Sequence, residues 1–180
     1  MKSSAAFLDR DGVVNEANIL NGKPYPPKNL NELKIVDGVK ESLELLDQFG
    51  YVPVVITNQP DIARGSQTWF TLGELHAEIR ALTGITHFYV CPHDDADLCD
   101  CRKPSPGLIF QAAKELSLDL QSSFLVGDRW RDIEAGHNTA IKSYFVDNGY
   151  QERRPTAPYI PVKSLFEAVS LELKLSNEKE

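Results

Sequence analysis

Residues 4–12 read SAAFLDRDG, a short apolar run that ends in two carboxylates and a glycine. The run Ser4–Asp9 is continuous and apolar, which is typical of a strand covered on both faces of a parallel sheet. Asp9 and Asp11 follow it at once, and carboxylates beside a buried strand are costly unless they are paired or bound to a metal. An Asp-Gly turn would explain the same residues without any function. The stretch therefore predicts a strand that ends in either a turn or a functional site.

Further strands and helices alternate along the chain. Four more short apolar runs are typical of buried strands: residues 52–57 (VPVVIT), 86–91 (THFYVC), 123–127 (SFLVG) and 142–146 (KSYFV). Helical spacing of apolar residues marks 39–49 and 165–169, a capping-box pattern stands at Thr71 and Glu74, and Ser105-Pro106 predicts an N-cap and a first-turn proline. This order predicts an α/β, Rossmann-like fold, a mostly parallel sheet with helices on both faces.

Length and charge limit the function classes. The 180 residues predict a single domain over 1–180, and the irregular stretches 17–34 and 92–104 are too short for a separate cap domain. A formal charge of −7 without a basic stretch disfavours nucleic acid and anionic membranes as partners. No apolar run has the length of a membrane span or of the apolar part of a signal peptide, so we expect a cytoplasmic protein. We also expect a monomer. The last residues, SNEKE, predict a polar tail.

Polar side chains follow several of the predicted strands. In an open parallel sheet, ligands bind outside the carboxyl ends of the strands. Asp9 and Asp11 lie there, as do Thr57 and Asn58 after the second run and Asp128 after the fourth. Each segment alone has an ordinary explanation, a turn for the first and a helix cap for the others. Together they indicate a functional site, which the nearby Arg102-Lys103 pair would complete.

These residue types suit phosphoryl transfer. Carboxylates with water or phosphate oxygens are the ligands of Mg²⁺. One Asp can attack phosphorus as a nucleophile, and a second can protonate the leaving alkoxide and later deprotonate water. A Thr hydroxyl, backbone N–H groups and a Lys can hold the non-bridging oxygens as charge builds. The sequence therefore predicts Mg²⁺-dependent chemistry at a phosphate group.

A cysteine cluster predicts a second metal. Cys91, Cys99 and Cys101 fall within eleven residues and, with His93, supply a Cys₃His set that suits structural zinc. The alternative is a group of reduced thiols beside an unrelated histidine, whereas a redox role is disfavoured because no Cys-x-x-Cys is present. Four protein ligands leave no open position for catalysis, so zinc would order the loop that carries Arg102 and Lys103. The other histidines, His76, His87 and His137, are expected to be packing or surface residues.

The chain resembles the haloacid dehalogenase superfamily of phosphohydrolases. FLDRDGVVNE is similar to its first motif, VVITN to its second, CRKP to its third and VGDRWRD to its fourth. The resemblance covers nearly the whole chain, and it implies a Mg²⁺-dependent phosphatase that forms an aspartyl phosphate. A signalling receiver, in which an aspartate is only phosphorylated, and a catalytically inactive binding module are the alternatives from other classes. Measurable phosphate turnover would separate them from an enzyme.

The first three motifs imply roles residue by residue. Asp9 matches the nucleophile that also ligates Mg²⁺, and Asp11 matches the general acid/base whose main-chain carbonyl binds the metal. Thr57 and Asn58 match the phosphate-holding second motif. Lys103 matches the lysine that stabilises the phosphoryl group. In the fourth motif, Asp128 matches the carboxylate that binds Mg²⁺, and Asp132 is implied to have a supporting role. Arg102, next to Lys103, and Arg129, next to Asp128, are implied to contact the substrate.

The segment CPHDDADLCDCRKPSPG resembles the zinc loop of one branch of this superfamily. That branch contains the D-glycero-D-manno-heptose 1,7-bisphosphate phosphatases and the histidinol-phosphate phosphatases. Residues 62–65 (IARG) resemble the heptose enzymes, which favours removal of the C7 phosphate of the heptose bisphosphate, with histidinol phosphate or another small metabolite as the alternative. Lys23 and Lys28, in the stretch 17–34, are candidates for meeting a second anionic group.

Overall fold

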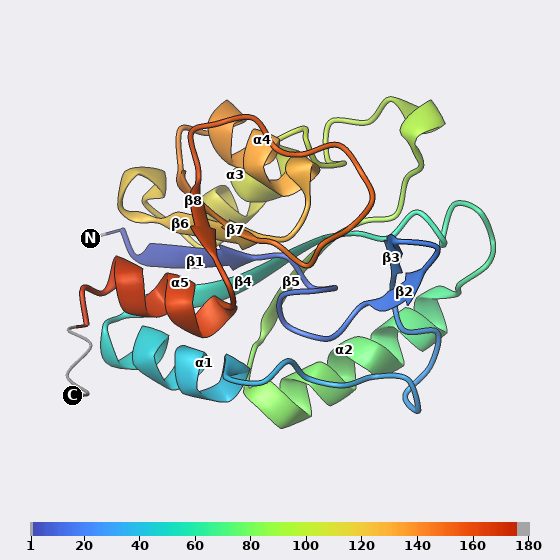
Figure 1. Cartoon of the computed structure of the whole chain (residues 1–180), viewed down its shortest axis with the longest axis horizontal. Helices are drawn as coiled ribbons and strands as arrows, with labels where there is room; N and C mark the ends of the chain where they lie inside the picture. Colours follow the sequence, from blue (N-terminus) through green and yellow to red (C-terminus); the bar gives the residue numbers. More distant parts are fainter. Residues whose placement is uncertain (1, 176–180) are drawn as a thin grey trace.

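The computed structural model describes residues 2–175, and the predicted polar tail lies outside this part. A six-stranded sheet forms its centre, in the order β5-β4-β1-β6-β7-β8, and every neighbouring pair is parallel (Figure 1). The strand β1 is flanked by β4 and β6, so the carboxyl ends of these three strands lie together. The strands are β1 (Ser4–Leu8), β4 (Tyr51–Asn58), β5 (His87–Cys91), β6 (Phe124–Gly127), β7 (Lys142–Val146) and β8 (Ile160–Val162).

Helices cover both faces of the sheet, which confirms the predicted fold class. One face carries α1 (Val39–Gln48), α2 (Trp69–Thr83) and α5 (Leu165–Glu172), and the other carries α3 (Gly107–Glu115) and α4 (Trp130–Asn138) (Figure 1). Two short 3₁₀ helices, η1 (Asp95–Asp97) and η2 (Leu120–Ser122), lie in connecting segments. Within residues 2–175, no helix combines the length and the apolar character that crossing a membrane requires.

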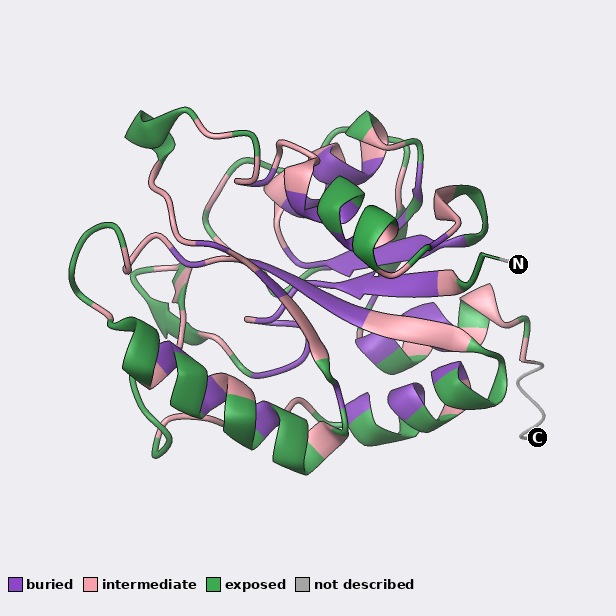
Figure 2. Ribbon diagram, turned by 180° about the vertical axis from the view of Figure 1, so that it is seen from behind, coloured by how far each residue is buried: buried purple, intermediate pink, exposed green. Residues whose placement is uncertain are grey.

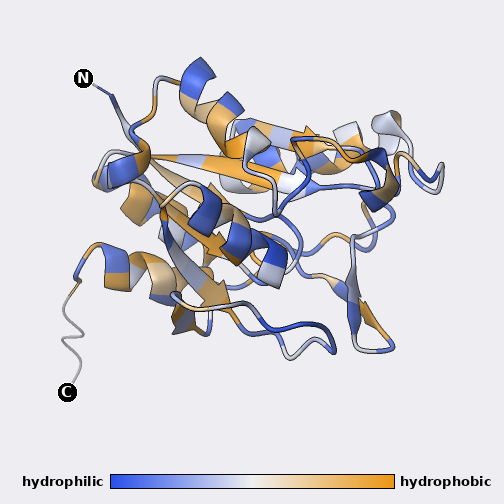
Figure 3. Cartoon of the chain, turned by 90° about the horizontal axis from the view of Figure 1, so that it is seen from above, coloured by the Kyte–Doolittle hydropathy of each residue, from blue (hydrophilic) through white to orange (hydrophobic). Residues whose placement is uncertain are grey.

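The core consists of two apolar layers, one on each side of the sheet. Side chains alternate along a strand, so Ala6 and Leu8 of β1 pack with α1, α2 and α5, while Ala5 and Phe7 pack with α3 and α4. The strands β1, β6 and β7 are buried along most of their length, whereas the helices expose their outer faces (Figure 2). Hydrophobic residues concentrate in the same strands (Figure 3). Each large apolar side chain buried in this way contributes about 1.5–3 kcal/mol.

The stretch 17–34 contains a β-hairpin, which corrects the prediction that it is irregular. The strands β2 (Asn18–Leu20) and β3 (Lys23–Tyr25) pair antiparallel, with Asn18 opposite Tyr25. The turn residues Asn21 and Gly22 have φ values of 52° and 72°. Asn-Gly is the preferred pair for a two-residue hairpin turn because both positions need a positive φ. The sequence therefore contains a hairpin signal, the Asn21-Gly22 pair, although the neighbouring prolines suggested an irregular stretch.

Two predicted helix starts are wrong by one to three residues. The α2 helix has Thr68 as its N-cap, and the Thr68 hydroxyl accepts a 3.1 Å hydrogen bond from the Thr71 N–H, so the capping box at Thr71 does not form. The α3 helix begins at Gly107, and Pro106 rather than Ser105 occupies the N-cap position without a side-chain hydrogen bond. The N–H of Gly107 instead donates to the carbonyl of Asp100 at 3.0 Å, which joins the start of α3 to the cysteine loop.

Candidate active site

Three buried side chains meet at the carboxyl edge of the sheet. Asp9 follows β1, Thr57 lies near the end of β4 and Asp128 follows β6, and β1 lies between the other two strands. Their exposed fractions are 7% for Asp9 and 1% for both Thr57 and Asp128. Asp9 and Thr57 line a cleft of about 400 Å³. The parallel sheet thus brings together residues that lie far apart in the sequence.

Three carboxylates cluster at this edge. One oxygen from each of Asp9, Asp128 and Asp132 lies within 4.8 Å of the other two, and all three residues are buried. Asp132 reaches the cluster from the first turn of α4, where its Oδ2 accepts a 2.9 Å hydrogen bond from the Arg129 N–H. The Oδ1 atom of Asp128 is buried without a hydrogen-bond partner among the described residues. Buried carboxylates with a free oxygen fit a hard divalent cation such as Mg²⁺, which takes oxygen ligands.

Lys103 joins two of these carboxylates. Its Nζ lies 2.5 Å from Asp9 Oδ1, 2.6 Å from Asp132 Oδ1 and 2.7 Å from the main-chain oxygen of Ile56. The residue is only 2% exposed, so its charge is compensated almost wholly by these neighbours. Burial lowers the pKa of Lys103, but the negative charges of Asp132 and Asp9 raise it by a larger amount. The net shift of the pKa is upward, so the ammonium group stays charged.

The carboxyl groups of Asp9 and Asp128 resist ionisation in the absence of a metal. Burial raises the pKa of Asp9 to about 7, an effect that Lys103 offsets in part and that Asp132 and Asp11 strengthen. Burial, together with repulsion from Asp9 and Asp132, also raises the pKa of Asp128 well above its ordinary value. A bound cation would favour the ionised forms, so the electrostatics couple this cluster to metal binding.

Asp11 lies in a separate hydrogen-bond network beside the cluster. Its carboxylate accepts hydrogen bonds from Arg10 Nη2 at 2.9 Å to each oxygen, from Gln59 Nε2 at 2.8 Å and from Asn15 Nδ2 at 3.0 Å. The fully buried Arg10 also reaches the Nε2 atom of His76 at 3.1 Å. Burial and the neighbouring Arg10 lower the pKa of His76 to about 3, so its neutral ring accepts this bond.

The second motif holds the lysine loop in place. Asn58 donates from Nδ2 to the main-chain oxygen of Lys103 and accepts from the Lys103 N–H, both at 3.0 Å. Thr57 Oγ1 accepts a 2.8 Å hydrogen bond from the buried Gln59. Thr57 and Asn58 both line the cleft, which is consistent with the predicted substrate contacts. In this structure, however, the amide of Asn58 is engaged by the backbone of Lys103.

Six cationic side chains line the cleft, together with five aspartates. Arg102 and Arg129, both predicted to contact substrate, are among them, and each is paired: Arg102 Nε lies 2.7 Å from Asp95 Oδ1, and Arg129 Nη2 lies 2.5 Å from Glu152 Oε2. Lys23 of the hairpin lines the same cleft, whereas Lys28 lines a neighbouring groove. The cations outnumber the aspartates by one, so the cleft is less negative than the chain as a whole, whose net charge is −7, and this balance suits an anionic ligand. The remaining cations of the cleft are Arg64, Lys103 and Arg131.

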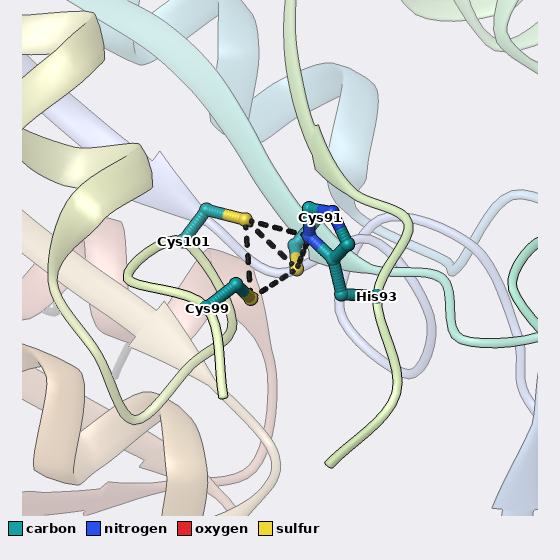
Figure 4. A group of neighbouring side chains, drawn as sticks. All are labelled: Cys91, His93, Cys99 and Cys101. Carbon is teal, nitrogen blue, oxygen red and sulfur yellow. Dashed lines mark hydrogen bonds between the residues drawn. The ribbon is translucent and has the colours of Figure 1, made fainter. Parts of the chain in front are cut away.

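The four predicted zinc ligands lie together (Figure 4). The sulfur of Cys91 lies 3.6 Å from that of Cys99 and 3.1 Å from that of Cys101, and His93 Nδ1 lies 3.2 Å from the Cys101 sulfur. A tetrahedral zinc with Zn–S bonds of about 2.3 Å separates its sulfurs by about 3.7 Å, so the cluster has the size of such a site. All three cysteines are free thiols.

Of the three thiols, that of Cys99 loses its proton most readily, whereas burial raises the pKa of Cys91 and of Cys101. Burial also raises the pKa of the Cys99 thiol, but hydrogen bonds from Cys101 and from the main chain at Arg102 outweigh that effect and lower it to about 7. Thiolates are the form of cysteine that binds metal.

The segment that carries the cluster is also attached to the rest of the protein by ion pairs. Arg64 Nε lies 2.6 Å from Asp94 Oδ2, and Arg131 Nη1 lies 3.1 Å from Asp95 Oδ1.

Several residues of the site have no counterpart in the sequence-based prediction. Asn15 and Gln59 hold Asp11, and Arg131 lines the cleft. Asn148 and Tyr150, in the segment after β7, donate hydrogen bonds to Asp128 at 3.1 and 2.6 Å. Asn15 and Arg131 fall within the first and fourth motifs, and Gln59 follows Thr57 and Asn58 at the end of a predicted strand, so a sequence signal existed for these three.

Comparisons with known proteins show which family the chain resembles. The family model described as HAD-hydrolase-like matches residues 100–168. The chain is 38% identical over 150 residues to the D-glycero-beta-D-manno-heptose-1,7-bisphosphate 7-phosphatase of Pasteurella multocida, covering 77% of this chain and 78% of that protein. It is 35% identical over 179 residues to the D-glycero-alpha-D-manno-heptose-1,7-bisphosphate 7-phosphatase of Photorhabdus laumondii, covering 92% of this chain and 94% of that protein.

The solved structures show the same likeness. The D,D-heptose 1,7-bisphosphate phosphatase from B. bronchiseptica, a complex with magnesium and phosphate, superposes with a TM-score of 0.82 at 27% sequence identity. The match covers 96% of this chain and 99% of that one. The relatives at 35–38% identity therefore place this chain in a family of phosphatases. The chain belongs to the HAD-like hydrolases, in the family of the D-glycero-D-manno-heptose-1,7-bisphosphate 7-phosphatases.

Proposed function

We propose that this protein hydrolyses the C7 phosphate ester of a D-glycero-D-manno-heptose 1,7-bisphosphate through an aspartyl phosphate on Asp9. The observation that carries the proposal is the position of the Asp9 carboxylate. It lines the cleft, lies within 4.8 Å of the Asp128 and Asp132 carboxylates, and is held 2.5 Å from Lys103. A buried carboxylate with a fixed cation beside it at the floor of a cation-lined cleft is suited to attack on phosphorus.

Asp9 and Asp128 would hold Mg²⁺, with the main-chain carbonyl of Asp11 as a further ligand. The free Oδ1 atom of Asp128 supports this assignment, because a buried carboxylate oxygen without a partner is costly unless a cation binds it. When bound, the ion neutralises the phosphate and supports charge on its oxygens. Asp132 would remain a supporting residue, since its oxygens are already taken by Lys103 and by the Arg129 N–H.

The reaction would proceed in two displacements. In the first, an oxygen of Asp9 bonds to phosphorus while the P–O bond to the sugar breaks, and Asp11 gives its proton to the leaving alkoxide. In the second, Asp11 takes a proton from a water molecule that attacks phosphorus, which releases inorganic phosphate and restores the Asp9 carboxylate. Lys103 and the Thr57 hydroxyl would hold the non-bridging oxygens in both steps.

The cysteine cluster would hold a structural zinc. Cys91, His93, Cys99 and Cys101 supply four ligands, which complete a tetrahedral site and leave no position for substrate. The ion would order the segment that leads into Arg102 and Lys103. Lys103 follows Cys101 by two residues, so the catalytic lysine is close in sequence to a ligand of the metal.

The comparisons favour the heptose bisphosphate over histidinol phosphate as the substrate. The relatives at 35–38% identity are heptose-bisphosphate phosphatases, and they include enzymes for both anomers. Arg102, Arg129 and Lys23 on the walls of the cleft supply positive charge beyond Lys103, as a substrate with two phosphates requires.

A phosphate-release screen tests the substrate assignment. The purified protein with Mg²⁺ is assayed against the alpha and beta anomers of the heptose 1,7-bisphosphate, histidinol phosphate and fructose 1,6-bisphosphate. We expect one heptose anomer to give the highest kcat/KM, by at least about tenfold over the other compounds. Equal or faster turnover of histidinol phosphate would reject the heptose assignment while leaving the phosphatase mechanism intact.

A further inference from the structure

The segment that follows β7 begins at the carboxyl edge of the sheet (Figure 1). Two of its side chains contact Asp128. Tyr150 donates a hydrogen bond from its hydroxyl to Asp128 Oδ2 at 2.6 Å. The Nδ2 atom of Asn148 lies 3.1 Å from the same carboxylate oxygen and 3.1 Å from the Tyr150 hydroxyl oxygen. Two donors from one segment therefore converge on a single oxygen of Asp128.

The two oxygens of Asp128 are in different environments. Oδ2 accepts both hydrogen bonds, whereas Oδ1 is buried and has no partner within the described part of the chain. A carboxylate that is hydrogen-bonded through one oxygen cannot rotate freely, so its other oxygen keeps a fixed direction. The hydrogen bonds to Oδ2 thus leave Oδ1 as the atom available to a cation.

The backbone after β1 is shaped to admit this contact. Gly12 has a φ of 94°, and a Cβ atom there would lie 1.8 Å from Asp128 Oδ2 and 2.7 Å from the Tyr150 hydroxyl. Asn148 Nδ2 also donates to the carbonyl of Gly12 at 3.0 Å. Glycine at this position therefore lets the turn after Asp11, the Asp128 carboxylate and the Tyr150 ring tip pack together.

The segment is also attached to the hairpin turn and to the residue that precedes α4. The N–H of Gln151 donates to the carbonyl of Gly22 in the hairpin turn at 2.8 Å, and Glu152 pairs with Arg129. Both attachments are made by the two residues that directly follow Tyr150. These attachments hold the segment, and with it the Tyr150 hydroxyl, in a defined position relative to Asp128.

We propose that Tyr150 is a positioning residue for the divalent cation, fixing the Asp128 carboxylate so that Oδ1 is free to ligate the metal, with Asn148 as its supporting donor. The proposal rests on the proposed function, because it assumes that Asp128 is a Mg²⁺ ligand. Tyr150 itself is not a ligand, since its hydroxyl is directed at Oδ2. Hydrogen-bond partners of metal ligands typically change metal affinity by 10- to 100-fold when they are removed.

The test measures metal binding without substrate. Mn²⁺, whose free form is counted by electron paramagnetic resonance, is titrated into wild-type protein, Tyr150→Phe, Asn148→Ala and Asp128→Asn. Tyr144→Phe is the matched control, because the Tyr144 hydroxyl also donates to a carboxylate, Glu172 Oε2, at 2.7 Å, but does so away from the cleft. Thermal unfolding of each variant shows whether it folds, and Asn148→Ala serves if Tyr150→Phe does not.

We expect Tyr150→Phe to bind Mn²⁺ about tenfold more weakly, Asn148→Ala to lose a smaller factor, and Tyr144→Phe to bind like the wild type. Excess Mg²⁺ should restore the phosphatase rate of Tyr150→Phe. Wild-type affinity in folded Tyr150→Phe, or an equal loss in Tyr144→Phe, would overturn the positioning role while the metal site stands. If wild-type protein and Asp128→Asn bind Mn²⁺ alike, the assumed metal site fails, and the proposal fails with it.

Discussion

The Nζ atom of Lys103 lies 2.5 Å from the Oδ1 atom of Asp9, although the two residues are 94 positions apart in the sequence. The contact joins the end of the central strand to a segment that contains few apolar residues of its own. That segment carries the Cys₃His cluster two residues before the lysine. The position of the lysine relative to the nucleophile therefore depends on what orders the cysteine segment.

Removing zinc should reduce activity through Lys103. We expect zinc-free protein to lose about 10²-fold in kcat/KM at saturating Mg²⁺, which is the scale for a displaced catalytic group. Lys103→Ala should cost a comparable factor, as the loss of one charge-stabilising group does. The measurement is a cycle of four activities, wild type and Lys103→Ala with and without zinc. If the two losses multiply fully in protein that is still folded, the zinc does not act by placing Lys103.

The cysteine cluster should bind one zinc per chain. Metal analysis of protein purified without chelator should give a Zn:protein ratio near one, separate from exchangeable Mg²⁺. Cys99→Ala should lower this ratio and reduce the melting temperature by about 5–10 °C, because a structural zinc contributes to folding stability. Leu98→Ser is the control, since Leu98 lies beside Cys99 and is 88% exposed. A wild-type ratio near zero would contradict the zinc assignment.

Mg²⁺ binding should weaken as the pH falls below 7. Burial raises the pKa of Asp9 to about 7 in the metal-free protein, so below that pH the ion must displace a proton from the carboxyl group. Protonation of Asp9 alone should reduce the apparent affinity by up to about tenfold per pH unit below pH 7, and the raised pKa of Asp128 should steepen this dependence. Calorimetric titration in buffers of different ionisation enthalpy measures both the affinity and the released proton. Constant affinity between pH 6 and 8, without proton release, would argue against Asp9 as a ligand.

The central part of the site was predictable because the positions and the ends of the strands follow from local patterns. Continuous apolar runs predict buried parallel strands, and the carboxyl ends of such strands lie on one edge, which brings Asp9, Thr57 and Asp128 together. The cysteine spacing predicted the Cys₃His cluster in the same way. The chemistry at this edge could be predicted from the types of residue that follow each strand.

The rest of the site depends on the path of segments without periodic patterns. Tyr150 and Asn148 lie in a stretch after β7 that has no helix or strand signal, and their contact with Asp128 exists only in the folded chain. The amide of Asn58 binds the Lys103 backbone, a partner 45 positions away that no local pattern indicates. The short strand β8 was missed because three residues carry too little periodicity.

The most direct test of the account follows the two phosphates of the heptose 1,7-bisphosphate by ³¹P nuclear magnetic resonance in the presence of Mg²⁺. With wild-type protein, the account predicts that the C7 phosphate signal disappears, inorganic phosphate appears and the C1 phosphate signal remains. Asp9→Asn keeps the shape of the side chain but lacks the nucleophilic charge, so its spectrum should stay unchanged. Release of phosphate by Asp9→Asn at the wild-type rate, in protein checked for deamidation, would contradict the account.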